Sequence, residues 1–209
     1  MNKDLGVSSA KELDGATFCI QAGTTTELNL TDYFKANKME YKAVTYDTSG
    51  QTIDGFKKGR CDAVTSDASQ LYGLKLKMSN PNSVIVLPEI ISKEPLGPVV
   101  RQGDDNWFNV VRWTMFALLE AEELGISSSN ADKMLKSENP SIKRLLGTSG
   151  KAGENLGLKS DWAYQIIKNV GNYGESFDKH VGKDSPLNIN RGLNNLWNKG
   201  GLMYSMPVR

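Results

Sequence analysis

Residues 17–46, TFCIQAGTTTELNLTDYFKANKMEYKAVTY, carry the pattern that decides the fold. The stretch opens with a short apolar segment of high strand propensity, Thr17–Gln21, and closes with a second one, Tyr41–Tyr46. Between them, Glu27–Asn37 spaces its apolar residues as an amphipathic helix does. A strand, a helix and a second strand in so short a stretch indicate a βαβ unit with parallel strands.

The start of the predicted helix has its own signature. Thr24-Thr25-Thr26-Glu27 fits a capping box, in which a hydroxyl at the N-cap and a carboxylate three residues later satisfy two backbone amides. Gly23 comes just before this run and breaks the preceding strand. We therefore expect the helix to begin directly after the Gly23 turn.

The alternation of strand and helix patterns continues along the chain to residue 87. Pro88 closes the last strand pattern. The whole region predicts the order βαβαβαβ, a parallel sheet with helices on its faces and right-handed crossovers. The segments after residue 46 are a helix at Thr52–Lys58, a strand at Cys61–Asp67, a helix at Ser69–Met78 and a strand at Ser83–Leu87.

The remainder of the chain has a different character. Lys93–Pro98 holds two prolines and a glycine, which indicates a hinge. Val99–Val100 is a candidate for one more strand, and the rest is mainly helical. Such helices need another layer on which to bury their apolar faces. The candidates are a helix from Asp104 or Asp105 to Gly125 with an apolar stripe, and helices at 130–136, 140–146, 160–170, 172–181 and 190–197.

Composition excludes several functional classes. Lys and Arg number 25 and Asp and Glu 24, for a net charge of +1, so we expect no nucleic-acid partner. No run approaches the roughly 18–20 apolar residues of a membrane span, so we expect no membrane insertion. No basic and then apolar leader opens the chain, so Met1 is not expected to start a signal peptide.

The residues that bind metals or carry out nucleophilic chemistry are scarce. His180 is the single histidine, and Cys19 and Cys61 have no CxxC or Cys/His spacing. We therefore expect no metal site and no cofactor, and a Cys–His nucleophile pair lacks a supporting signature. If the two cysteines lie on neighbouring strands they can form a disulfide, and in a reducing compartment they would be two buried thiols.

A candidate site follows from the strand ends, because ligands bind beyond the carboxyl ends of parallel strands. At the end of the first strand, a polar loop runs into a helix N-terminus, which suits an anion such as a carboxylate. Gly23 allows a ligand to approach the backbone closely. The alternative is that the threonines only cap the helix. The candidate binding residues are Gln21, Gly23, Thr24, Thr25 and Thr26.

Asp67 ends the predicted strand at 61–67 and faces the same edge of the sheet. Its carboxylate can accept charge-assisted hydrogen bonds from a ligand ammonium group. Its alternative role is an N-cap for the helix that follows. An anion site and a cation site on one edge together predict a zwitterionic ligand.

Several long stretches resemble one known family, the general L-amino-acid-binding proteins of polar amino-acid ABC transporters, which are periplasmic solute-binding proteins of family 3. The resemblance covers essentially the whole chain. It is carried by GATFCIQAGTTTELNLTDYF (15–34), GRCDAVTSDASQLYGL (59–74), VLPEIISKEPLGPVVRQGDDNWF (86–108), LGLKSDWAYQIIKNVGNYGESFD (156–178) and RGLNNLWNKGGLMYSMPVR (191–209).

The resemblance implies an α/β fold like that of type II periplasmic binding proteins. Residues 1–93 would form most of lobe two, and residues 94–209 the hinge return and the helical C-terminal part of an incomplete lobe one. By this template the chain is N-terminally truncated. It lacks a strand before Met1 and the arginine that clamps the ligand carboxylate in the family.

The resemblance also implies roles for residues. Gln21 and Gly23–Thr26 match the positions that receive the ligand carboxylate, and Asp67 matches the carboxylate that binds the α-amino group. Cys19 and Cys61 match a cysteine pair. The implied partners are a polar L-amino acid, or a broad range of them, and an ABC permease, in the periplasm. An incomplete lobe would favour a homodimer or a strand-exchanged oligomer.

Three functional hypotheses follow. The first is an amino-acid-binding component, or a truncated remnant of one, that performs no chemistry. The alternative is an interaction or dimerisation protein of the same descent that binds no ligand. The third is a dehydratase-like enzyme on the same fold. An enzyme is disfavoured because the predicted cleft has no histidine and Glu89 and Glu94 form no defined acid pair.

Overall fold

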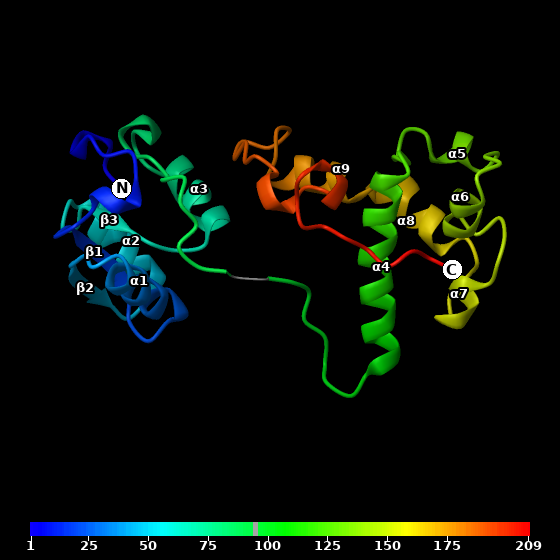
Figure 1. Cartoon of the computed structure of the whole chain (residues 1–209), viewed down its shortest axis with the longest axis horizontal. Helices are drawn as coiled ribbons and strands as arrows, with labels where there is room; N and C mark the ends of the chain where they lie inside the picture. The colour runs from blue at the N-terminus through cyan, green and yellow to red at the C-terminus, as the bar shows by residue number, and fades with distance from the viewer. Residues whose placement is uncertain (94–95) are drawn as a thin grey trace. The chain divides into compact units, whose positions relative to one another are not determined.

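The computed structural model describes residues 1–93 and 96–209, and the chain divides into two compact units, Met1–Leu96 and Gly97–Arg209 (Figure 1). The expected boundary between residues 93 and 94 involves Glu94, which lies outside the described residues, so that boundary stays a prediction. Each unit has its own core and is described by itself.

The first unit is built on a parallel sheet of three strands. They are β1 (Thr17–Gln21), β2 (Lys42–Tyr46) and β3 (Ala63–Val64), in the order β2-β1-β3. Phe18 of the central strand lies opposite Ala43 on one side and Ala63 on the other. The parallel α/β lobe that the sequence predicts is therefore present.

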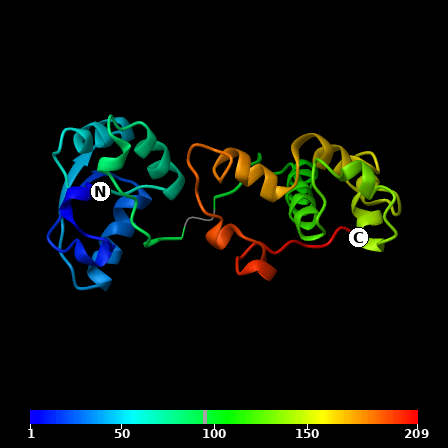
Figure 2. The ribbon, with the colours of Figure 1, turned by 90° about the horizontal axis from the view of Figure 1, so that it is seen from above.

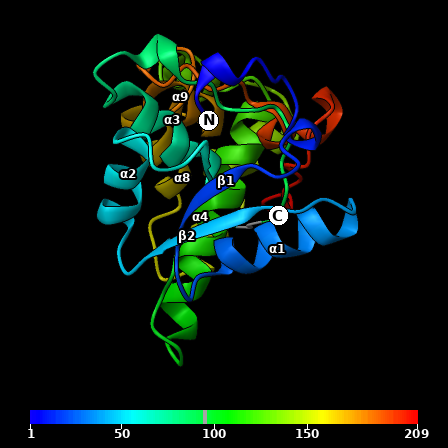
Figure 3. The ribbon, with the colours of Figure 1, turned by 90° about the vertical axis from the view of Figure 1, so that its left-hand side faces the viewer.

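Each strand leads into a helix. These helices are α1 (Thr25–Ala36), α2 (Ser49–Lys57) and α3 (Ala68–Leu76), and Figure 3 shows α1 and α2 on opposite sides of the strands. This placement follows from right-handed crossovers that run first to one side of β1 and then to the other. Consequently, the N-termini of all three helices lie at the carboxyl edge of the sheet.

The two faces of β1 pack into separate apolar clusters because alternate strand residues point to opposite sides. Phe18 and Ile20 face α1, where the ring of Phe18 meets that of Phe34 edge-on at 5.3 Å. Cys19 faces the other way and forms a disulfide with Cys61 in a cluster with Phe56 and Val84. The expected disulfide is confirmed.

The strand predicted at residues 83–87 is wrong. A 3-10 turn at Pro81–Ser83 precedes Val84, which forms only an isolated antiparallel bridge with Asn2. The backbone of Met1 exchanges two hydrogen bonds with that of Ile85. These residues therefore pair with the beginning of the chain, near the 3-10 turns Lys3–Leu5 and Ala10–Glu12, and do not extend the sheet.

Two other strand predictions need correction. The strand predicted at Cys61–Asp67 is formed only at Ala63–Val64, so residues 65–67 form an irregular loop that precedes α3. Val99–Val100 does not form a strand.

The second unit is helical. Its longest helix, α4 (Asp105–Glu123), begins where Oδ1 of Asp104 accepts a hydrogen bond from the Trp107 amide at 2.9 Å. Figure 2 looks nearly along α4 and shows α8 and α9 beside it. The other helices are α5 (Ala131–Met134), α6 (Pro140–Leu145), α7 (Ala152–Asn155), α8 (Trp162–Val170) and α9 (Tyr173–His180).

The end of the chain forms no regular helix. The helix predicted at residues 190–197 is wrong, because the structure has two 3-10 turns there, Gly192–Asn194 and Trp197–Lys199. The final segment crosses α4 (Figure 1), and Val208 is buried in the core of the unit. None of the helices in the described ranges is both long enough and apolar enough to cross a membrane.

Candidate functional site

The carboxyl edge of the sheet brings together the loops that follow β1, β2 and β3. Cys19 of β1 lies directly opposite Val64 of β3, so the residues that follow each of them leave the sheet at the same edge. The predicted binding residues of the Gln21–Thr26 loop and Asp67 are placed there. Three helix N-termini at one edge add partial positive charges that favour an anion.

The loop after β1 is held by its own hydrogen bonds. The Thr24 hydroxyl donates to the carbonyl oxygen of Gln21 at 2.8 Å and accepts from the Glu27 amide at 3.4 Å. The Ala22 amide donates to the carbonyl of Tyr46 on β2 at 2.9 Å. Gly23 has a φ of +69°, a left-handed conformation that favours glycine. The turn is therefore fixed before any ligand binds.

The capping box predicted here forms only in part. The Glu27 carboxylate accepts a hydrogen bond from the Gly23 amide at 2.8 Å, and not from the amide of the N-cap residue Thr24. The backbone amides of Thr24, Thr25 and Thr26 consequently find no acceptor among residues 1–93 and 96–209. Thr24 does cap the helix, as the alternative proposed for the threonines, yet these three backbone donors at its N-terminus have no acceptor within the described residues.

Asp67 stands at the N-cap position of α3, but its side chain makes no capping hydrogen bond. It is exposed, and within the described ranges its carboxylate has neither a hydrogen-bond donor nor an ion-pair partner. The capping role that the sequence left open is therefore not used. A free carboxylate on the same edge as free amides is an arrangement that can accept both charges of a zwitterion.

A series of hydrogen bonds between polar side chains lies beside Asp67 and was not predicted from the sequence. Gln70 on α3 is hydrogen-bonded through its amide oxygen to the Ser66 hydroxyl, and its amide nitrogen donates to the hydroxyl of Ser49 at 3.2 Å. It thus joins the loop before Asp67 to the start of α2. Residue spacing gave no sign of this link because Ser49 is 21 positions away.

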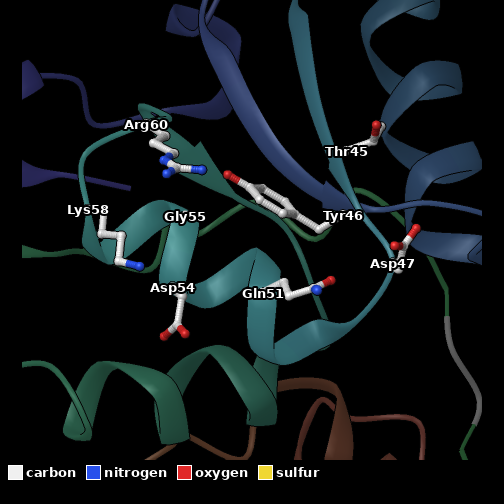
Figure 4. Close-up of a pocket in the computed structure, with 8 residues that line it drawn as sticks. All are labelled: Thr45, Tyr46, Asp47, Gln51, Asp54, Gly55, Lys58 and Arg60. Carbon is white, nitrogen blue, oxygen red and sulfur yellow. The ribbon is translucent and has the colours of Figure 1, made fainter.

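An open hollow of about 380 Å³ lies between the end of β2 and α2 (Figure 4). None of the predicted binding residues lines it, and its charged groups have both signs. The ring of Tyr46 lies against Gly55, where a Cβ atom would clash with it. Tyr46 therefore packs β2 closely against Gly55 of α2 at one side of the hollow. Its lining residues are Thr45, Tyr46, Asp47, Gln51, Asp54, Gly55, Lys58 and Arg60.

Glu89, one of the two carboxyl groups that the sequence offered for acid–base chemistry, is engaged in hydrogen bonds. Glu89 accepts hydrogen bonds from the Ser9 hydroxyl and the Ala10 amide, and the Ser9 bond holds the pKa of Glu89 below its usual value. A carboxyl group with a lowered pKa is a poor proton donor near neutral pH. Glu94 lies outside the described residues, and the described ranges hold no cluster of metal-ligating side chains.

Comparison with known proteins gives similar sequences. No protein-family model matches the chain. The chain is 60% identical over 205 residues to the putative amino-acid ABC transporter-binding protein YhdW of Escherichia coli K12. It is 56% identical to the general L-amino acid-binding periplasmic protein AapJ of Rhizobium johnstonii, and 50% identical to the glutamate/glutamine/aspartate/asparagine-binding protein BztA of Rhodobacter capsulatus.

These matches cover 98–100% of the chain but only 60–62% of each relative. A solved structure, an ABC transporter periplasmic binding protein from Brucella ovis with glutathione bound, is 55% identical to the chain and superposes with a TM-score of 0.93. The match covers the whole of this chain and 66% of the Brucella chain. The chain thus spans about three fifths of the length of its curated relatives.

Proposed function

Because this chain is 50–60% identical over almost its whole length to amino-acid-binding and periplasmic ABC-transporter-binding proteins, we propose that it binds the backbone of an L-amino acid without chemistry. The observation that carries the proposal is the pairing of free groups at one sheet edge. The amides of Thr24–Thr26 lack acceptors and the carboxylate of Asp67 lacks donors among the described residues. An α-amino acid brings the two missing partners in one molecule.

Each residue of the proposed site has a distinct role. The ligand carboxylate accepts hydrogen bonds from the amides of Thr24, Thr25 and Thr26, aided by the positive end of α1. Asp67 accepts the ligand ammonium. Gly23 contributes through its left-handed turn, since its amide is already bound to Glu27. Gln21 contributes its carbonyl, which holds the Thr24 hydroxyl.

The substrate class is proposed from the relatives. One is described as a general L-amino-acid binder and another as a binder of glutamate, glutamine, aspartate and asparagine. The Brucella protein holds glutathione, whose γ-glutamyl end carries a free α-amino and a free α-carboxylate group. We propose that this chain takes polar L-amino acids and ligands with the same head group, and that an ABC permease in the inner membrane receives them from the periplasm.

Isothermal titration calorimetry of the chain tests this proposal. L-glutamine, L-glutamate, L-asparagine and glutathione are injected, and 3-phenylpropionate, which has a carboxylate but no α-amino group, serves as the control. The proposal expects heat from at least one zwitterionic ligand and none from the control. No heat from any amino acid at millimolar concentration would contradict it.

An interaction protein is the second candidate, and one observation favours it. Trp107 and Phe108, in the first turn of α4, are 53% and 45% exposed, although large aromatic side chains are usually buried. A homodimer would cover them. Sedimentation equilibrium decides this point: a mass that doubles with concentration supports self-association, whereas a constant mass of 23.0 kDa opposes it.

A further inference from the structure

We propose that Glu27 is an internal competitor of the ligand carboxylate and lowers the affinity of the site for it; this inference rests on the proposed function. The Glu27 carboxylate already accepts the Gly23 amide at 2.8 Å, in the same loop that offers the amides of Thr24–Thr26. One carboxylate of the protein thus occupies a donor next to those that a ligand carboxylate needs.

The charge of Glu27 acts at the same place as the charge of the ligand. Glu27 is the third residue of α1, within the first turn, where the positive end of the helix attracts anions. Within the described ranges no lysine or arginine lies at ion-pair distance from it. Its negative charge therefore offsets part of the attraction that α1 exerts on a second anion.

Glu27 also has a structural role, which a test must separate from its charge. By accepting the Gly23 amide, it ties the turn to the helix. A glutamine at this position can accept the same hydrogen bond through its amide oxygen but carries no charge. An alanine removes both the acceptor and the charge. The two substitutions therefore distinguish a competitor from a simple loop tie.

The binding test compares Glu27→Gln and Glu27→Ala with the unchanged chain and with Glu40→Gln. Glu40 precedes β2 at the opposite, amino edge of the sheet, is exposed, and gives the same change in net charge. We expect Glu27→Gln to lower the Kd for L-glutamine about two- to fivefold at low salt, with a smaller gain at high salt. Glu27→Ala should gain less, because the loop loses its tie. Equal Kd values for Glu27→Gln and Glu40→Gln at both salt concentrations would overturn the inference.

A second measurement decides the inference even if the chain binds no amino acid, in which case the proposed function fails by itself. Acetate, a carboxylate without an ammonium group, is titrated while the amide signals of Thr24–Thr26 are followed by NMR. We expect them to shift at lower acetate concentration in Glu27→Gln than in the unchanged chain or Glu40→Gln. Identical responses in the three proteins, or no response in any of them, would refute the role of Glu27.

Discussion

Cys19 and Cys61 are joined by a disulfide across 5.5 Å between their Cα atoms, and this bond ties β1 to the residues that lead into β3. These two strands carry the two halves of the proposed site, because the Gln21–Thr26 loop follows β1 and Asp67 follows β3. The bond is buried. It therefore holds β1 and the start of β3 together from within the core.

Replacing both cysteines by serine should destabilise the first unit. The bond closes a loop with a sequence separation of 42 residues. In the chain-entropy model, such a loop corresponds to about 4 kcal/mol in the free energy of unfolding. Urea unfolding with and without dithiothreitol measures the change. Reductant should lower the midpoint of the unchanged chain and leave that of the double variant where it is; equal midpoints for the two oxidised proteins would contradict the prediction.

Thr25→Pro should weaken amino-acid binding roughly 10- to 150-fold. It deletes one of the three amides that have no acceptor within the described residues, and a hydrogen bond to a charged group contributes roughly 1.5–3 kcal/mol. Thr25 is the first residue of α1, where proline is tolerated, and Thr24 has φ −107° and ψ 159°, which suits a residue before proline. Thr25→Ala keeps the amide and should bind as the unchanged chain does. Calorimetry checks both variants; a loss shared by proline and alanine would point to the hydroxyl.

Asp67→Asn should reduce affinity for a zwitterion roughly 10- to 100-fold, because an amide replaces the charge that binds the ammonium group. Asp32→Asn is the matched control, since Asp32 is exposed on α1, in the body of the helix. Binding is followed by calorimetry with L-glutamine. The role assigned to Asp67 is wrong if both variants bind equally well.

Glu120 should make the stability of the second unit depend on pH. It is 7% exposed and accepts the Val208 amide at 2.8 Å, and burial raises its pKa above the ordinary 4.5. The folded chain therefore holds this proton more tightly than the unfolded chain. Its contribution to stability is present when Glu120 is protonated and is lost as pH rises from 4.5 through the raised pKa.

Glu120→Gln keeps an acceptor for Val208 and removes the titration. Its free energy of unfolding should fall less with rising pH over that window than that of the unchanged chain or of Glu40→Gln. Urea titrations at a series of pH values give the curves. Parallel curves for all three proteins would show that Glu120 does not titrate differently on folding.

The sequence predicts best where local patterns decide the structure. Thr17–Gln21 forms the predicted strand, and the helix that follows starts at the Gly23 turn. Pairing partners are harder to predict. The apolar run at Val84 looks like a parallel strand, yet Val84 bridges to Asn2, 82 positions away and antiparallel. The pattern of one segment does not indicate which neighbour it joins.

The remaining differences between the predicted and the observed structure depend on which side chains become partners. At residues 190–197 the sequence suggested a helix, but the glycine and asparagines favour turns. Arg191 there forms an ion pair with Glu122 at 3.1 Å and covers the rings of Tyr173 and Phe177. The unused capping role of Asp67 and the bond from Gly23 to Glu27 likewise depend on atomic geometry that residue spacing does not contain.

One NMR titration tests the central claim most directly, namely that the turn after β1 and the residue before α3 bind the two charges of one small molecule. Assigned 1H–15N spectra of the chain are recorded as L-glutamine is added. The account predicts that the amide signals of Thr24–Thr26 and of Asp67 and Ala68 shift together along one binding curve. In Asp67→Asn, the amide signals of these residues should not shift at the same L-glutamine concentrations. Shifts of only one of the two segments, or of neither, would contradict it.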